Sequence, residues 1–223
     1  GMAEMLITKK GIEIVGVCDR NEARVGKEMH EVLGVERKNH PEVIINNSIE
    51  EVLSVPCDVC LIATDSFTAK TFDKIKMVVE KGVNVISTAE EMAYPQAQEP
   101  ELAKKIDELA KANGVSVLGT GINPGMIMDL LVVALTGAMT RVDNVIAKRV
   151  NSLSPFGKAV MEEQGVGITV EDFDKGVEDG TLAGHVGFAE SVQMIADALG
   201  WKVDRFEQQM KPIVTNVDRT SKY

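Results

Sequence analysis

The chain has 223 residues, of which 44% are hydrophobic and 26% charged, and its formal net charge is −10 at pH 7. Nucleic-acid binding draws its affinity from clustered Lys and Arg, so the scattered basic residues of this acidic chain argue against nucleic acid and favour a small-molecule partner. No apolar run approaches the roughly 18 residues that a membrane span needs, and the start shows no leader pattern. We therefore expect a soluble protein that is not exported and has no membrane partner.

The three cysteines are too few for a disulfide framework, which favours the reducing cytoplasm. Cys57 and Cys60 have the spacing of a redox or zinc pair, but they fall within one strand-like apolar run, where successive residues alternate faces. No second pair of cysteines or histidines completes a metal site, so no metal is expected.

Short β-branched runs alternate with longer helical stretches from Gly11 onward, a pattern typical of a parallel α/β sheet. The hydrophobic periodicity predicts strands over 12–19, 42–47, 57–64, 83–88 and 115–121. It predicts helices over 1–11, 21–34, 66–82, 100–114 and 126–139, with a further helix opening at a capping box, Ser48–Glu51. Asn123–Pro124–Gly125 is interpreted as the N-cap and first turn of the helix over 126–139.

The character of the chain changes near Thr140. Residues 141–151 alternate like a long strand, Thr169 can cap a short acidic helix, residues 188–200 form an amphipathic helix, and 201–215 predict an edge strand. We therefore predict two domains: an NAD(P)-binding Rossmann-type domain over 1–139, and an α+β substrate and oligomerisation domain over 140–223, expected to be truncated.

The first domain is expected to be a doubly wound parallel sheet without its first strand and most of its glycine-rich loop. Gly1 stands where the last glycine of that loop would be, although a remnant of an expression tag explains it equally well. Asp19 ends a strand, where a carboxylate can accept both hydroxyls of the adenosine ribose and repel a 2′-phosphate, which favours NAD. Arg20 could instead meet that phosphate, so NADP stays open. An ordinary strand-end turn would also explain Asp19.

A second glycine-rich turn, GTGINPG over 119–125, comes too late to be the pyrophosphate loop. In open parallel sheets, ligands lie outside the carboxyl ends of the strands. We therefore expect the cofactor crevice to be bordered by this turn and by the residues that follow two other strands: Gly121, Asn123, Ala63, Thr64 and Thr88. A plain helix cap would explain Asn123 without a cofactor.

Four segments carry a family resemblance: STAEEMAYP, GTGINPGMIMD, RVNSLSPFGKAVMEEQGVG and GHVGFAESVQMIADALGW. Together they resemble the 2,4-diaminopentanoate dehydrogenase family of the dihydrodipicolinate-reductase-like group. The resemblance covers nearly the whole chain, and members of the family are longer at both ends. It implies NAD(P)-dependent oxidative deamination of a diamino acid, 2,4-diaminopentanoate, to 2-amino-4-oxopentanoate and ammonia.

Such a reaction needs a carboxylate that holds the ammonium and activates water, and a cation for the substrate carboxylate. Glu90 and Glu91 follow a strand, and related amine dehydrogenases use a glutamate of this motif, so one of the two is expected to be catalytic. Which of them acts stays open, and a solvated acidic turn is the alternative.

Arg149 and Asn151 alternate onto one side of a predicted strand and could both face the substrate, Arg149 binding its carboxylate bidentately. An exposed sheet face would explain them as well. His185, flanked by two glycines, is expected in the substrate pocket, although a structural histidine fits its position equally well.

Two alternatives to this function remain: a related amine dehydrogenase or imine reductase with another substrate, and a non-catalytic dinucleotide-binding module. A homodimer or a higher homo-oligomer is expected, because the second domain would otherwise leave an apolar edge exposed.

Overall fold

The computed structural model describes residues 2–153, 155, 157–182 and 184–215. These form two compact units, each assembled from several stretches of chain. Unit 1 contains the chain up to Ile62 with Thr71–Ile86 and Lys104–Val117, and unit 2 contains Ala63–Lys70, Ser87–Ala103 and the chain from Leu118 onward. The domain boundary near Thr140 stays a prediction.

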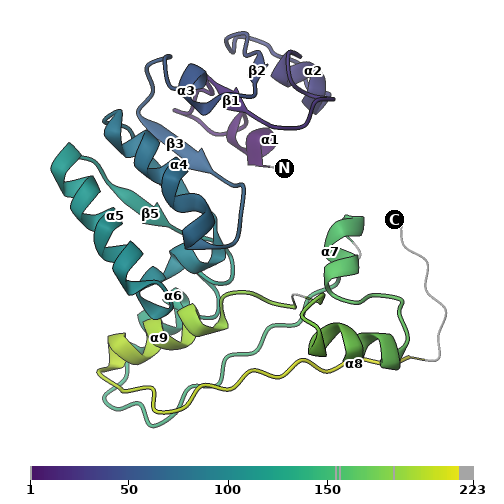
Figure 1. Ribbon diagram of the computed structural model, residues 1–223. Helices are drawn as coiled ribbons and strands as arrows, with labels where there is room; N and C mark the ends of the chain where they lie inside the picture. Colours follow the sequence, from purple (N-terminus) through teal and green to yellow (C-terminus); the bar gives the residue numbers. More distant parts are fainter. Residues whose placement is uncertain (1, 154, 156, 183, 216–223) are drawn as a thin grey trace. The chain divides into compact units, whose positions relative to one another are not determined.

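A three-stranded sheet has the order β3 (Val59–Ile62), β4 (Asn84–Ser87), β5 (Val117–Gly119). Val85 N donates to Ser116 O and Thr120 N donates to Ser87 O, both at 2.9 Å. The partner numbers rise together, so β4 and β5 run parallel. Helices α4 (Thr68–Glu80) and α5 (Pro100–Asn113) connect the successive strands, as Figure 1 shows. This arrangement confirms the predicted α/β fold.

The first residues of the chain form a smaller layer of unit 1. Strands β1 (Val17–Cys18) and β2 (Ile45–Asn46) pair in parallel and are accompanied by α1 (Met2–Leu6), α2 (Met29–Leu33) and α3 (Ile49–Val52). Both strands are shorter than the runs that predict them. Their small core consists of buried Met29, Val43 and Ile45.

The helix predicted over 21–34 is largely a series of turns, and only α2 is helical. Gly26 adopts a positive φ of 78°, and its N–H donates to Ile45 O at 2.8 Å while Ile45 N donates back to Lys27 O at 2.9 Å. These bonds hold the chain against β2, so the helical bonding pattern cannot continue through this point.

Several predicted helix boundaries are confirmed. The Ser48 side chain accepts from Glu51 N at the start of α3, and Gly114 ends α5 with a φ of 67°. The apolar faces of α4 and α5 supply several of the buried side chains of unit 1, among them Ile75, Val78, Val79 and Ile106. Burying each stabilises the fold by roughly 1.5–3 kcal/mol.

Unit 2 contains two 3₁₀ turns, η1 (Glu90–Ala93) and η2 (Pro95–Ala97), and helices α6 (Leu130–Thr136), α7 (Lys158–Glu163), α8 (Val170–Glu178) and α9 (Phe188–Leu199). Thr169 caps α8 and Gly200 ends α9, as predicted. Helix α6 starts later than predicted: Asp129, not Asn123, is its N-cap, because the Asp129 carboxylate accepts from Leu130 N. Among the described helices, none has both the length and the apolar composition needed to cross a membrane.

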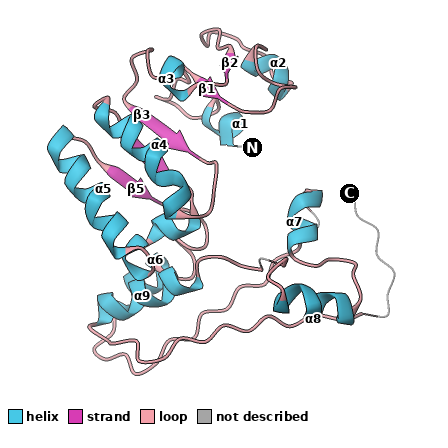
Figure 2. Ribbon diagram, in the orientation of Figure 1, coloured by secondary structure: helices cyan, strands magenta, loops and turns pink. Residues whose placement is uncertain are grey.

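The strands predicted over 141–151 and 201–215 are absent from the described part of the chain, where both segments are extended loops (Figure 2). A strand is defined by a ladder of hydrogen bonds to a neighbour, and no such ladder involves these described residues. Their apolar side chains are correspondingly exposed, Val150 and Ile213 at 98% each. In the described residues beyond Thr140, the regular elements are therefore helices.

Candidate active site

Glu91 lies in η1, directly after β4, and its side chain is 8% exposed. Its carboxylate oxygen Oε2 accepts a hydrogen bond from Thr68 N at 2.7 Å, and its own N–H donates to Ser66 O at 3.1 Å. Glu91 therefore caps the N-terminus of α4, where a negative charge is favoured by the helix dipole.

A second buried carboxylate, Glu190 in α9, acts on Glu91. Burial raises the pKa of Glu91, the hydrogen bond from Thr68 N lowers it in part, and the charges of Glu190 and Glu99 raise it further. Glu190 is 0% exposed, and its Oε1 accepts from Gln98 Nε2 at 2.7 Å. Its Oε2 has no hydrogen-bond partner among the described residues.

The segment that carries Glu90 and Glu91 is held in place by its neighbours. Helix α9 packs on both η1 and η2, and the Tyr94 hydroxyl donates to Asp197 Oδ2 at 2.7 Å, which raises the pKa of Tyr94 to about 12. At the end of β5, Gly119 approaches so closely that a Cβ there would lie 1.6 Å from Met92 O. Only glycine allows this contact.

The surroundings of Glu90 differ from those of Glu91. It is half-buried, and its negative charge acts on the ring of His185. His185 Nε2 lies 2.9 Å from Asn123 Nδ2, and the ring contacts the edge of Phe188. Burial and the positive charge of Arg149 lower the pKa of His185, and Glu90 opposes them in part.

The structure thus brings Glu90, Arg149, His185 and Asn123 into one region of unit 2. Arg149 is exposed on the extended segment 141–151, from which its charge reaches the imidazole. Asn151, two residues further on, is also exposed, and no described contact links it to the group.

The turn over 119–125 is tightly folded. A Cβ on Gly121 would lie 2.6 Å from Pro124 O, and one on Gly187 would lie 2.3 Å from the Pro124 ring, so the turn packs directly against the segment that carries His185. Asp129 is 0% exposed and links the turn to α9. Its Oδ2 accepts hydrogen bonds from Gly125 N and from Ser191 Oγ, both at 2.8 Å.

The other residues predicted to border the cofactor crevice in unit 2 follow the carboxyl ends of β3 and β4. Ala63 and Thr64 are exposed and Thr88 is half-buried. All three therefore occupy the edge of the sheet at which ligands of parallel α/β proteins bind.

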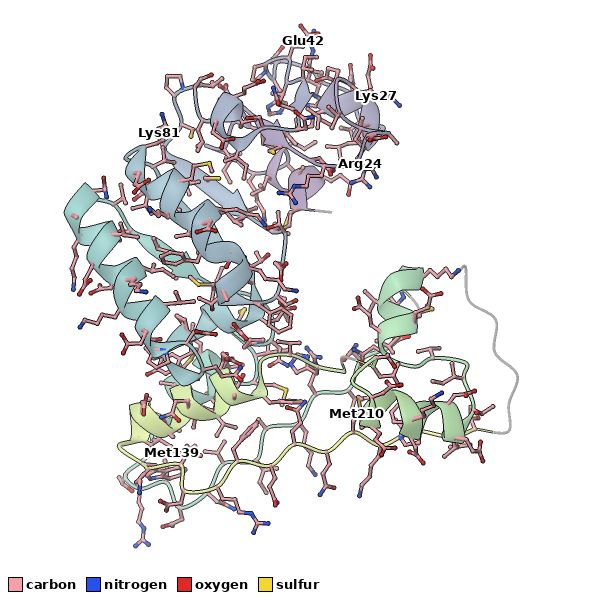
Figure 3. The ribbon with its side chains drawn as sticks, in the orientation of Figure 1. Arg24, Lys27, Glu42, Lys81, Met139 and Met210 are labelled. Atoms are coloured by element: carbon pink, nitrogen blue, oxygen red, sulfur yellow. The ribbon has the colours of Figure 1, made fainter. Side chains whose placement is uncertain are left out.

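In unit 1, Asp19 follows β1 and accepts from Asn21 N at 2.9 Å and from Arg24 Nη1 at 2.9 Å; Arg24 is labelled in Figure 3. These two contacts, the Asn21 N–H first, lower the pKa of Asp19. Beside it, Arg20 lines a cavity of about 350 Å³ with Glu22, Val25 and Asn47. Gly1 lies outside the described residues.

Sequence reasoning missed the two carboxylates that are buried most completely, Glu190 and Asp129. A signal was available for Glu190, because it lies one turn before Met194 on the apolar face of α9, where a charged residue is out of place. Asp129 gave a weaker signal, since it interrupts an apolar run only once.

Residues 126–223 match the family model described as the 2,4-diaminopentanoate dehydrogenase C-terminal domain. The chain is 61% identical over 224 aligned residues to a 2,4-diaminopentanoate dehydrogenase of Acetoanaerobium sticklandii, and the match covers 100% of this chain and 63% of that protein. The chain therefore spans less than two thirds of the length of the curated relative it matches.

Among solved structures, an amine dehydrogenase from Mycobacterium smegmatis superposes with a TM-score of 0.77 at 29% sequence identity, over 91% of this chain and 59% of that one. The identity along the whole chain, the C-terminal match and the shared fold agree with the resemblance carried by the four sequence segments. The chain is therefore similar to 2,4-diaminopentanoate dehydrogenase along its whole length, and its residues 126–223 match the model of that family's C-terminal domain.

Proposed function

We propose that the protein catalyses the oxidative deamination of 2,4-diaminopentanoate at its 4-amino group, with a nicotinamide dinucleotide as the oxidant. The 61% identity to a relative of that name supports the substrate. The observation in the structure that supports the chemistry is the placement of His185 against Asn123 and Phe188, where the charges of Glu90 and Arg149 both act on its ring.

The two ends of the substrate need opposite partners. Arg149 offers a guanidinium that can bind the substrate carboxylate through two parallel hydrogen bonds. The Glu90 carboxylate can bind the ammonium at the reacting end. By accepting a proton from that ammonium, Glu90 converts the nitrogen to the neutral amine.

The nicotinamide, when bound, accepts the hydride that leaves C4. The C4–N bond then has iminium character, and a water molecule adds to C4. Glu90, having released the ammonium proton to solvent, takes a proton from this water as the C–O bond forms, which gives a neutral carbinolamine. It passes that proton to the nitrogen and takes the hydroxyl proton as the C–N bond breaks, so that ammonia leaves and the 4-oxo group remains. Each step needs Glu90 to be accessible to substrate and water, which its half-buried position allows.

Of the two adjacent glutamates, we assign the catalytic role to Glu90. Glu91 is buried, and its Oε2 is engaged by Thr68 N at 2.7 Å, so it anchors η1 to α4. No hydrogen bond to the Glu90 carboxylate occurs among the described residues, and its charge acts on His185.

The test is amine-dependent reduction of NAD and NADP at alkaline pH by the purified protein, with 2,4-diaminopentanoate beside simple amines. We expect turnover with the diamino acid, a loss of about 10²–10⁴-fold in kcat for Glu90→Gln, and a much smaller loss for Glu91→Gln, whose amide oxygen can still accept from Thr68 N. Equal losses in the two variants would contradict the assignment. Turnover of simple amines alone would favour the amine dehydrogenase alternative, and cofactor binding without any turnover would favour a non-catalytic module.

For the cofactor, we propose that NAD is preferred. The strand-end carboxylate of Asp19 fits a ribose diol, and its pairing with Arg24 holds it in place. Arg20, beside the 350 Å³ cavity, is the group that would admit a 2′-phosphate. Asp19→Ala is expected to lower the ratio of NAD to NADP affinity by about tenfold in a calorimetric titration, and an unchanged ratio would contradict this role.

We further propose that the protein works in the cytoplasm as a homo-oligomer. The described cysteines carry free thiols, as a reducing compartment requires, and burial raises the pKa of Cys60 to about 11, which leaves it unreactive. Exposed apolar side chains along 141–151 and 201–215, such as Val150 and Ile213, support an assembly that covers them. Sedimentation velocity at micromolar concentration distinguishes a dimer or higher assembly from a monomer.

A further inference from the structure

The contact between Asn123 and His185 links the orientation of the carboxamide to the tautomer of the imidazole. Asn123 Nδ2 lies 2.9 Å from His185 Nε2. In this orientation the carboxamide nitrogen is the donor and Nε2 the acceptor, which places the proton of a neutral ring on Nδ1. Asn123 Oδ1 is buried without a partner among the described residues, so the contact with this ring is the one side-chain hydrogen bond of the carboxamide that is observed there.

The surroundings disfavour a second proton on this ring. The charged groups that act on it are Arg149 from the extended segment and Glu90 from η1, and the Phe188 ring covers one edge, with 4.6 Å between the ring centroids. Burial and the guanidinium both oppose a second proton. A neutral ring with Nε2 occupied presents a single donor, Nδ1–H, and no hydrogen bond from Nδ1 occurs among the described residues.

We propose that Asn123 is a positioning residue for substrate specificity: by holding His185 as the Nδ1–H tautomer, it makes the imidazole a donor that binds the carboxylate of an amino-acid substrate together with Arg149. A carboxylate only accepts hydrogen bonds, so an imidazole with a lone pair on Nδ1 would repel it. The pair thereby selects amines that carry a carboxylate over simple amines. This inference rests on the proposed function and deepens it.

Asn123→Asp tests the proposal, because the substitution keeps the shape of the side chain and reverses its hydrogen bonding. At pH 10, where the imidazole is neutral, an aspartate can only accept, so the proton moves to Nε2 and Nδ1 becomes an acceptor. Asn144→Asp is the matched control: it introduces the same charge at an exposed position of the segment that carries Arg149.

The first readout is the tautomer itself, measured by long-range ¹H–¹⁵N NMR on protein labelled at its 3 histidines, with His185→Gln assigning the signal. We expect Nδ1–H in the unaltered protein and in Asn144→Asp, and Nε2–H in Asn123→Asp. An Nε2–H tautomer in the unaltered protein would overturn the proposal.

The second readout is binding, measured by calorimetry with two probes. Norvaline has the carboxylate and the 2-amino group but lacks the 4-amino group that would react; 2-aminopentane has no carboxylate. Because one hydrogen bond to a charged group is lost, we expect Asn123→Asp to weaken the binding of norvaline about 10- to 100-fold and the binding of 2-aminopentane less than about threefold. Equal weakening of both probes, or of neither, would overturn the proposal.

The two hypotheses fail separately. A protein that turns over no amine but shows the tautomer exchange and the selective loss of norvaline would refute the dehydrogenase and leave the carboxylate subsite standing. A protein that oxidises 2,4-diaminopentanoate with the same KM before and after Asn123→Asp would refute the subsite alone.

Discussion

Asp129 is expected to be among the most sensitive positions for stability in unit 2, and Asp129→Ala measures this. The side chain is 0% exposed and accepts three hydrogen bonds, from Leu130 N at 2.7 Å and from Gly125 N and Ser191 Oγ at 2.8 Å each. Alanine leaves all three donors without their acceptor. An unsatisfied buried donor costs about 1–3 kcal/mol, and the Ser191 hydroxyl can rotate, so the expected loss is about 3–5 kcal/mol.

The matched control is Thr169→Ala at the N-cap of α8, where the hydroxyl accepts from Asp172 N at 3.1 Å in an exposed setting. That substitution is expected to cost about 1 kcal/mol. Urea unfolding followed by circular dichroism gives both values from the midpoints. Asp129→Asn, which retains one acceptor oxygen, serves as the test if Asp129→Ala does not fold. Its loss of stability should lie between those of Asp129→Ala and Thr169→Ala. A loss at Asp129 no larger than that at Thr169 would refute the reasoning.

Glu91→Gln is expected to unfold at a higher urea concentration than the unaltered protein at pH 8. The pKa of Glu91 is raised in the folded state, so its contribution to stability is fully present below the ordinary pKa of about 4.3 and is lost as the pH rises through the folded-state pKa. Glutamine carries no charge at pH 8 and therefore avoids this loss. A difference that persists unchanged at pH 4 would contradict this origin. Gly119→Ala should cost more than about 3 kcal/mol, since its Cβ would meet the backbone oxygen of Met92 at 1.6 Å. Gly137→Ala, whose Cβ would lie 3.4 Å from its nearest atom, should be neutral or slightly stabilising in the same urea unfolding experiment.

The sequence predicted the elements whose stability is decided locally. The βαβ units around β3, β4 and β5 follow from hydrophobic period and from caps such as Ser48 and Gly114. The elements that depend on distant partners were predicted wrongly. Residues 21–28 have a helical composition, but hydrogen bonds between Gly26, Lys27 and Ile45 hold them against β2. Residues 141–151 have a strand-like alternation without a strand beside them among the described residues.

The same distinction applies to the candidate site. Glu90, His185 and Arg149 could be named from motif and residue type, because the chemistry requires a carboxylate and a cation. The difference between a half-buried Glu90 and a buried Glu91 bonded to Thr68 N could not be predicted, since it depends on where Thr68 N and Glu190 lie. The role of Asn123 was likewise hidden, because its partner His185 is 62 residues away in the sequence.

The close contact between β5 and η1 has a consequence for how this family can diversify. Glu90 lies in a segment that packs closely against Gly119, Thr68 and α9, so substitutions that change the size of its side chains will cost stability. Arg149 is borne by an exposed segment without such constraints. Mutation can therefore sample new recognition groups at little thermodynamic risk while the reacting carboxylate stays in place. Libraries aimed at new amine substrates belong in 141–151, and those that randomise 89–94 will lose more of their variants to misfolding.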